Sequence, residues 1–183
     1  MNIKKALLKE HSKNQCGVIT KYIGSNKERF AELMKCFFEG EYRVTQRAAW
    51  PMSYCVQDHP ELIKPYFKKL LDNLDKPGLH NAIARNTIRL LQHIDIPEKF
   101  HGQVMNICFN YIQDTATPVA IKAFSLTTLE NLSKKYPDIL PELKLVIEER
   151  WDYETAAFKS RAKKILNSTK SFRLSGRLKK PSL

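Results

Sequence analysis

The stretch VTQRAAWPMSYCV, residues 44–56, combines residue types that could form a binding or reactive site. Arg47 is a permanent cation, and Trp50 offers an aromatic face on which a cation or a base can stack. Pro51 removes one backbone hydrogen bond from a segment whose periodicity predicts a helix. The same residues would also suit an ordinary helix of a repeated scaffold. Only the elements that position them can decide between these interpretations.

A series of basic residues recurs at nearly constant spacing, and we call it the basic column. Its members are Arg47, Arg85, Lys122 and Lys159, which follow one another at intervals of 38, 37 and 37 residues. Three further basic residues could extend it, namely Arg89, Arg161 and Lys163. A line of cations on one surface could bind phosphates.

A structural interpretation of the basic column competes with this one. Three acidic residues recur at intervals of 39 and 38, namely Asp75, Asp114 and Asp152. Each could pair with a basic residue of the adjacent repeat, because stacked repeats place equivalent residues side by side. The two interpretations are compatible, and both stay open at this point.

The net charge of +12 is concentrated at the two ends of the chain. Residues 1–27 hold six lysines and one glutamate, and residues 159–183 hold nine basic residues and no acidic residue. Residues 28–158 hold 16 basic and 18 acidic side chains and are therefore nearly neutral. A nucleic-acid interface would have to use the ends of the chain, or a favourable placement of the charges between them.

The segment 168–183 is rich in serine and basic residues, and we expect a flexible tail there. Four of its basic residues alternate with apolar ones, and these are Arg173, Arg177, Lys179 and Lys180. Such a segment can bind nucleic acid, an acidic protein or an anionic membrane surface. It can equally be a solvated terminus that maintains solubility.

Motifs of cofactor and metal chemistry are missing from the sequence. It contains neither a Gly-x-Gly-x-x-Gly motif, a P-loop nor a Gly-x-Ser-x-Gly elbow. Glu98 and His101 have the spacing of a carboxylate-bridged metal motif, but no second pair accompanies them, so a polar pair on a helix surface is expected. The four cysteines are scattered and never form Cys-x-x-Cys. We therefore predict neither a cofactor nor a metal.

Helical periodicity is almost continuous along the chain. It predicts helices near 2–10, 13–23, 26–38, 42–57, 60–74, 79–94, 97–113, 118–135, 138–150 and 154–167. Capping patterns place helix starts at Ser12, Ser25 and Asp58, and Thr117 precedes a proline suited to a first helical position. We expect Pro51 to kink or split its helix and to leave a groove near Tyr54.

These helices form pairs that repeat. Pro60, Pro97 and Pro137 each open a pair, at intervals of 37 and 40 residues. In the second helices, apolar residues recur in register, and Trp50 takes the position that Ile88 and Leu126 hold in later repeats. A period of this length in helix pairs is typical of an α-solenoid.

The units 60–96 and 97–136 resemble HEAT-type repeats. The segments QRAAW and IARNTI match the basic-then-small start of a HEAT second helix, and Pro65 and Pro141 match the kinked first helix. The resemblance covers roughly residues 25–167 and implies architecture only. The chain also resembles small bacterial HEAT-like proteins, which implies no activity.

The predicted fold is all-α: a right-handed α-solenoid of about four HEAT-like hairpins with an N-terminal capping hairpin. The predicted boundaries are 1–24 for the cap, 25–58, 59–96, 97–136 and 137–167 for the repeats, and 168–183 for the tail. The start of the chain is charged and does not resemble a signal peptide, and no segment is apolar enough to span a bilayer. These features predict a cytoplasmic protein.

The predicted function is a non-catalytic scaffold that binds a macromolecule, foremost a protein, on a concave surface lined by second helices. The alternative is a nucleic-acid-binding protein that uses the basic column and the tail. Its remote extension is DNA base excision, because one HEAT-like family removes alkylated bases. No catalytic residue of that family can be carried over to this chain, which has two tryptophans and a nearly neutral body.

Overall fold

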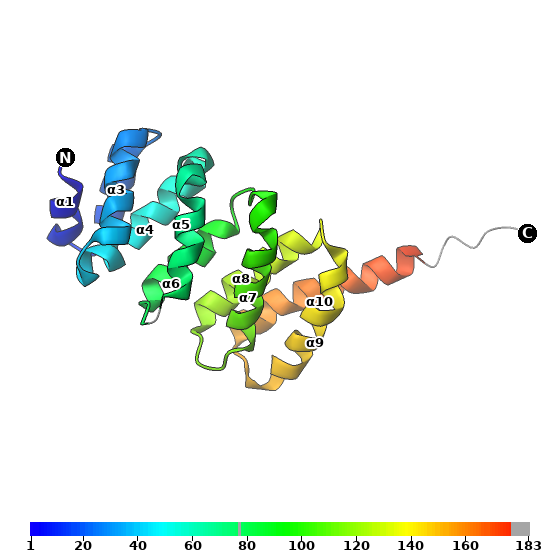
Figure 1. Cartoon of the computed structure of the whole chain (residues 1–183). Helices are drawn as coiled ribbons and strands as arrows, with labels where there is room; N and C mark the ends of the chain where they lie inside the picture. Colours follow the sequence, from blue (N-terminus) through cyan, green and yellow to red (C-terminus); the bar gives the residue numbers. More distant parts are fainter. Residues whose placement is uncertain (77, 177–183) are drawn as a thin grey trace, which may run out of the picture. The chain divides into compact units, whose positions relative to one another are not determined.

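The computed structural model describes residues 1–76 and 78–176, with the backbone alone for residues 168–176. Every regular element in this range is a helix (Figure 1). The α-helices are α1 (Ile3–Lys9), α2 (Lys13–Ile23), α3 (Lys27–Glu39), α4 (Tyr42–Asp58), α5 (Phe67–Asp72), α6 (Asn81–Leu91), α7 (His101–Gln113), α8 (Val119–Ser133), α9 (Leu140–Arg150) and α10 (Ala156–Gly176). Short 3₁₀ helices are η1 (Pro60–Tyr66), η2 (Asn73–Asp75), η3 (Glu98–Phe100), η4 (Pro137–Ile139) and η5 (Trp151–Tyr153). The all-α prediction is confirmed.

The chain divides into two compact units, Met1–Val104 and the residues from Met105 onward, and the division falls within α7. The handedness of the solenoid, its number of repeats and the predicted boundaries stay predictions. None of the described helices is both long and apolar enough to cross a membrane.

Asparagine and serine side chains begin the first three helices. Asn2, Ser12 and Asn26 each accept a hydrogen bond from the backbone N–H three residues later, which satisfies one of the unpaired donors of a helix start. The prediction for Ser12 is therefore confirmed, whereas the cap assigned to Ser25 belongs to Asn26. Asp58 is not a cap either, because it is the last residue of α4.

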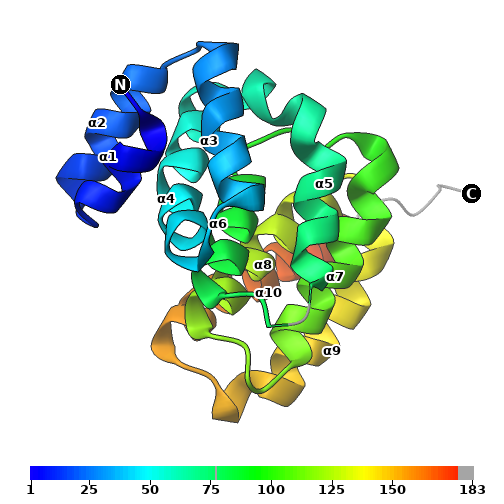
Figure 2. The ribbon, with the colours of Figure 1, turned by 60° about the vertical axis from the view of Figure 1, so that its left-hand side comes forward.

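Helix α4 is the centre of the first unit. It packs against α1, α2, α3 and α6, and Figure 2 shows it surrounded by these helices. Pro51 lies buried inside α4 without ending it, so it does not split the helix, and the alternative of a kink stays a prediction. The hydroxyl of Ser53 donates to the Trp50 carbonyl at 2.9 Å in the turn around the proline.

The first unit has two layers of helices. Helices α1 and α3 pack together on one side with the η1–α5 segment, where Phe30 meets Tyr66 and Lys69 pairs with Glu39. Helices α2, α4 and α6 form the other layer, in which α4 packs against both neighbours. We call the outer side of this layer the second-helix surface. The buried rings of Phe30, Phe37 and Phe67 lie in the core of this unit.

In the second unit, α10 packs against α8 and α9. The side chains that these helices bury include Leu126, Leu129, Ile147 and Phe158, each fully buried. Helix α10 was predicted to end near residue 167, but it continues to Gly176. The first nine residues of the predicted flexible tail, 168–176, are therefore helical.

Candidate functional site

The second-helix surface of the first unit carries an ordered pair of side chains, Tyr54 from α4 and Arg89 from α6. The Nη2 atom of Arg89 donates to the Tyr54 hydroxyl at 3.2 Å, and its guanidinium lies 4.8 Å from the centre of the ring. Hydrogen bonds from Arg89 and then from Trp50 lower the pKa of Tyr54. Arg89, predicted as an extension of the basic column, thus fixes an aromatic ring at a partly exposed position.

Trp50 is half-buried, and its ring meets His11 edge-on, with 5.6 Å between ring centres. Ile88 and Leu126, by contrast, are completely buried. Trp50, which repeat register aligns with these two residues, is therefore less buried than they are. Trp50 packs against His11, which lies between α1 and α2.

A groove of about 510 Å³ lies beside Tyr54, at the place where the sequence predicts one. Residues 13–24, from α2 and its end, form one wall, and Tyr54, Asp58 and His59 form the other. Its volume is within the range of natural ligand pockets. The groove and the three partly exposed side chains Trp50, Tyr54 and Arg89 make the second-helix surface the candidate binding site.

Arg47 of the basic column is engaged within the scaffold. Its Nη1 atom donates to the carbonyls of Leu7 at 3.0 Å and of Leu8 at 3.1 Å, close to the end of α1. A cation at this position satisfies carbonyls that lack a partner within the helix. The structural interpretation applies to Arg47, although its partners are carbonyls instead of an aspartate.

Arg85 differs, because its side chain is exposed and has no hydrogen bond or ion pair among the described residues. Asp75, the expected partner, is also exposed. We therefore expect Arg85→Ala to change the free energy of unfolding by less than about 0.5 kcal/mol. Arg47→Ala is the matched substitution, and it should cost about 1–2 kcal/mol because two carbonyls lose a charged donor. Urea denaturation of both variants measures the difference, and equal losses would contradict this assignment.

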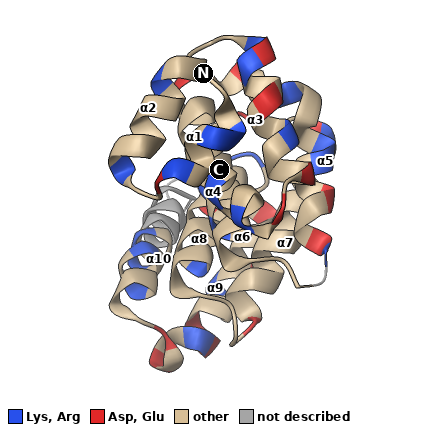
Figure 3. Ribbon diagram, turned by 90° about the vertical axis from the view of Figure 1, so that its left-hand side faces the viewer, with Lys and Arg blue, Asp and Glu red and all other residues tan. Residues whose placement is uncertain are grey.

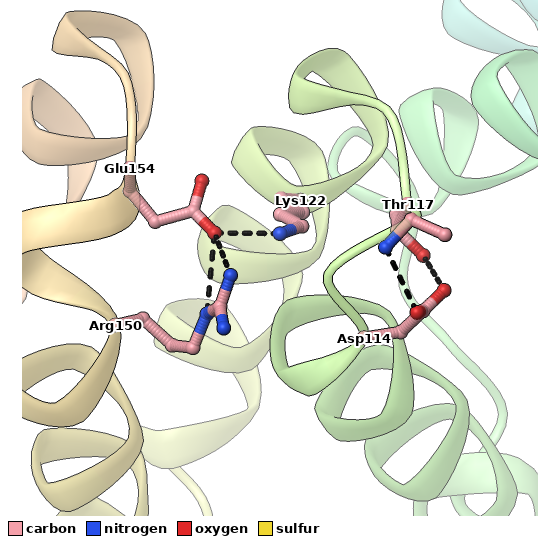
Figure 4. Close-up of polar contacts among 6 residues, drawn as sticks. Asp114, Thr117, Lys122, Arg150 and Glu154 are labelled. Carbon is pink, nitrogen blue, oxygen red and sulfur yellow. Dashed lines mark hydrogen bonds and ion pairs between the residues drawn. The ribbon is translucent and has the colours of Figure 1, made fainter.

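The second unit holds a buried cluster of charges (Figure 4). Oε1 of Glu154 accepts from Lys122 Nζ at 2.5 Å and from Arg150 Nη2 at 3.0 Å. The side chains of Lys122 and Glu154 are 3% and 4% exposed, so both charges lie out of water. Such a pair is stable only because each charge compensates the other. Lys122 belongs to the scaffold and is not available to a ligand.

The acidic partners predicted for the basic column are wrong. Asp152 is exposed, and Asp114 accepts hydrogen bonds from the backbone N–H of Ala116 and the hydroxyl of Thr117. These bonds lower the pKa of Asp114, and nearby Lys122 and Arg150 lower it further. Glu154 is not among the acidic partners that the spacing predicts, yet it is the residue that Lys122 contacts. The one available signal was its position four residues after Arg150, a spacing at which opposite charges can pair within a helix.

The basic residues predicted on α10 are less buried than Lys122 of α8. Arg161 donates to the Thr127 hydroxyl, and its guanidinium lies 5.6 Å from the centre of the Phe124 ring. Lys159 lies over the Trp151 ring, and Lys163 is exposed. The side chain of Arg173 and the residues Arg177, Lys179 and Lys180 lie outside the described part of the chain.

Within residues 1–76 and 78–176, no three His, Cys, Asp or Glu side chains gather in a metal-binding arrangement. His101, expected on a helix surface, is buried, and its Nε2 lies 2.6 Å from the carbonyl of Ile96. Burial raises the pKa of the Cys16 thiol to about 11 and of the Cys55 and Cys108 thiols to about 12. These three thiols are therefore protonated and poor nucleophiles at neutral pH.

The profile of one protein family, described as a HEAT repeat domain, matches residues 3–169. The match covers both helical layers of the first unit and α7 to α9 with most of α10. No curated protein and no solved structure matches the chain significantly.

Proposed function

The chain belongs to the HEAT repeat domain family. We propose that it is a non-catalytic scaffold that binds a protein partner on its second-helix surface. HEAT repeats commonly mediate protein interactions, because stacked helix pairs expose long continuous surfaces. The observation that supports this surface most directly is the Arg89–Tyr54 pair beside the groove. Tyrosine, tryptophan and arginine dominate the binding energy of protein interfaces, and Trp50 lies one helical turn from Tyr54.

The charges of the scaffold also support a protein partner over nucleic acid. Of the basic column, Arg47 and Lys122 are bonded within the scaffold and are not free to bind phosphates. The surface of α3 and α5 mixes acidic and basic residues (Figure 3). Basic segments that could still contact phosphates lie at the two ends of the chain, in α1 and α2 and in α10, where residues 156–167 hold four basic and no acidic residues.

Affinity capture with the full chain tests the proposal. The bait variant Tyr54→Ala/Arg89→Ala removes the ordered pair, and Tyr42→Ala/Lys64→Ala is a matched control that removes an exposed tyrosine and an exposed lysine away from the groove. We expect a protein captured by the unmodified chain and the control to be lost from the bait variant. All three baits are first shown to melt alike.

Two results would contradict the proposal. One is a partner that the bait variant retains in full. The other is captured nucleic acid whose amount falls steeply between about 50 and 200 mM salt, the behaviour of phosphate contacts. The second result would support the nucleic-acid alternative, with α10 as the next surface to change.

A further inference from the structure

Helix α2 has a glycine, Gly17, in its middle, and the fold does not require it. A Cβ atom at this position would meet nothing within 4 Å, and its φ is not positive. Glycine inside a helix costs about 0.5–1 kcal/mol relative to alanine. Gly17 lines the groove beside Tyr54. Its missing side chain leaves the helix backbone open to close approach from the groove.

The charges around this groove are asymmetric. Lys13 and Lys21 line it, both are exposed, and neither has an ion pair among the described residues. The groove also contains Asp58, on the opposite wall. Helices α1 and α2 together hold five lysines and no acidic residue, and Figure 3 shows blue segments on both. The α2 wall thus carries two lysines with Cys16 and Gly17 between them in sequence, and we call Cys16, Gly17 and the facing ring of Tyr54 the apolar floor. Thr20 and His59 also line the groove.

We propose that this groove binds an acidic amphipathic helix of the partner protein, with an apolar side chain over Gly17 against Tyr54 and carboxylates on Lys13 and Lys21. The inference rests on the proposed function and names the chemistry of its partner. Helix α2 has 11 residues and is about 16 Å long, which matches three turns of a bound helix. Binding of an amphipathic helix in a groove is a common mode of peptide recognition.

The carboxylate at Asp58 argues against nucleic acid in this groove. A phosphate backbone would pass between two lysines and an aspartate, and the apolar floor would offer it no partner. A bound amphipathic helix can instead place its apolar side chains toward the apolar floor. Its carboxylates can then face the lysines of α2 and stay away from Asp58.

The test uses the full-length protein and a designed helical peptide of about 12 residues, with leucines along one face and glutamates on the others. Peptides with alanine for leucine, or lysine for glutamate, and a double-stranded oligonucleotide are the comparison probes. Fluorescence anisotropy gives the affinity, and the amide signal of Gly17 in a ¹H–¹⁵N correlation spectrum reports the place of binding. We expect the acidic leucine peptide to bind best and to shift the Gly17 signal.

Two variants locate the site. Lys13→Glu/Lys21→Glu should weaken the acidic peptide at least about tenfold, equivalent to about 1.4 kcal/mol, and Gly17→Leu should block it. Lys27→Glu/Lys64→Glu is the charge-matched control on exposed lysines outside the groove and should change affinity less than about twofold. Equal losses in the two charge-reversal variants, no binding of the acidic peptide, no shift at Gly17, or preference for the oligonucleotide would each overturn the inference.

The captured partner separates this inference from the proposed function. A partner lost with Tyr54→Ala/Arg89→Ala but retained with Lys13→Glu/Lys21→Glu leaves the proposed function standing and overturns the acidic-helix inference. A partner retained by both variants overturns both. A partner lost with both supports both, provided that the control variants retain it.

Discussion

Glu154→Gln is expected to destabilise the second unit by about 3–5 kcal/mol, the cost of breaking a buried ion pair. The substitution keeps the shape of the side chain but removes its charge. It leaves Lys122, which is 3% exposed, and Arg150, which is 17% exposed, without their counter-charge. Unfolding is best followed by the fluorescence of Trp151, which lies close to Glu154 in sequence. A Trp50→Phe background makes it the sole tryptophan.

Asp152→Asn is the matched control for this prediction. It removes an exposed carboxylate two residues away and should change the free energy of unfolding by less than about 0.5 kcal/mol. The double variant Lys122→Met/Glu154→Gln should recover part of the loss, because no lysine is then stranded in an apolar environment. It also provides a folded comparison if Glu154→Gln does not fold. Equal stabilities of the Glu154→Gln single variant and the Asp152→Asn control would show that the cluster contributes nothing.

Gly40→Ala is expected to destabilise the first unit, by about 1–3 kcal/mol. Gly40 lies between α3 and α4, and its N–H donates to the Cys36 carbonyl at 3.2 Å. A Cβ atom here would come within 2.4 Å of that carbonyl oxygen and 2.9 Å of Cγ1 of Val44. The carbonyl belongs to the backbone of α3, and Val44 is buried in α4, so neither yields without moving a helix.

Gly17→Ala is the same chemical change in the same unit and should have the opposite sign. Nothing surrounds its new methyl group, and alanine favours the helix, so we expect a gain of about 0.5–1 kcal/mol. Both variants are compared by urea denaturation in a Trp151→Phe background, where Trp50 reports the first unit. A Gly40→Ala variant as stable as Gly17→Ala would show that the turn adapts without cost.

The helices could be predicted closely from the sequence, whereas the contacts of the site could not. Helix periodicity depends on neighbours along the chain and can therefore be recognised in the sequence. For α2, the predicted and the observed bounds are both 13–23. Ion pairs depend on which side chains the packing brings within a few ångströms. The spacing of Asp114 and Asp152 fitted the basic column, yet Lys122 pairs with Glu154.

Trp50 and Arg89 show the same limit within the candidate site. Repeat register aligns Trp50 with Ile88 and Leu126, which are buried, whereas Trp50 is half-exposed against His11. Arg89 was predicted as a possible extension of the basic column, which could bind phosphates. It is instead bonded to Tyr54, 35 residues earlier, because α4 and α6 pack side by side.

The sequence by itself determined that this chain is all-helical, that its helices recur as HEAT-like pairs, and that its charge is concentrated at its ends. These properties depend on residue types and their spacing along the chain, so they can be recognised in the sequence without knowing the packing. Only the tertiary structure decided which basic residues are structural and which are free, because burial and partner distance arise from packing between distant segments. Arg47 and Arg85 were predicted to occupy equivalent places in the repeat, yet one bonds carbonyls of α1 and the other lies in solvent.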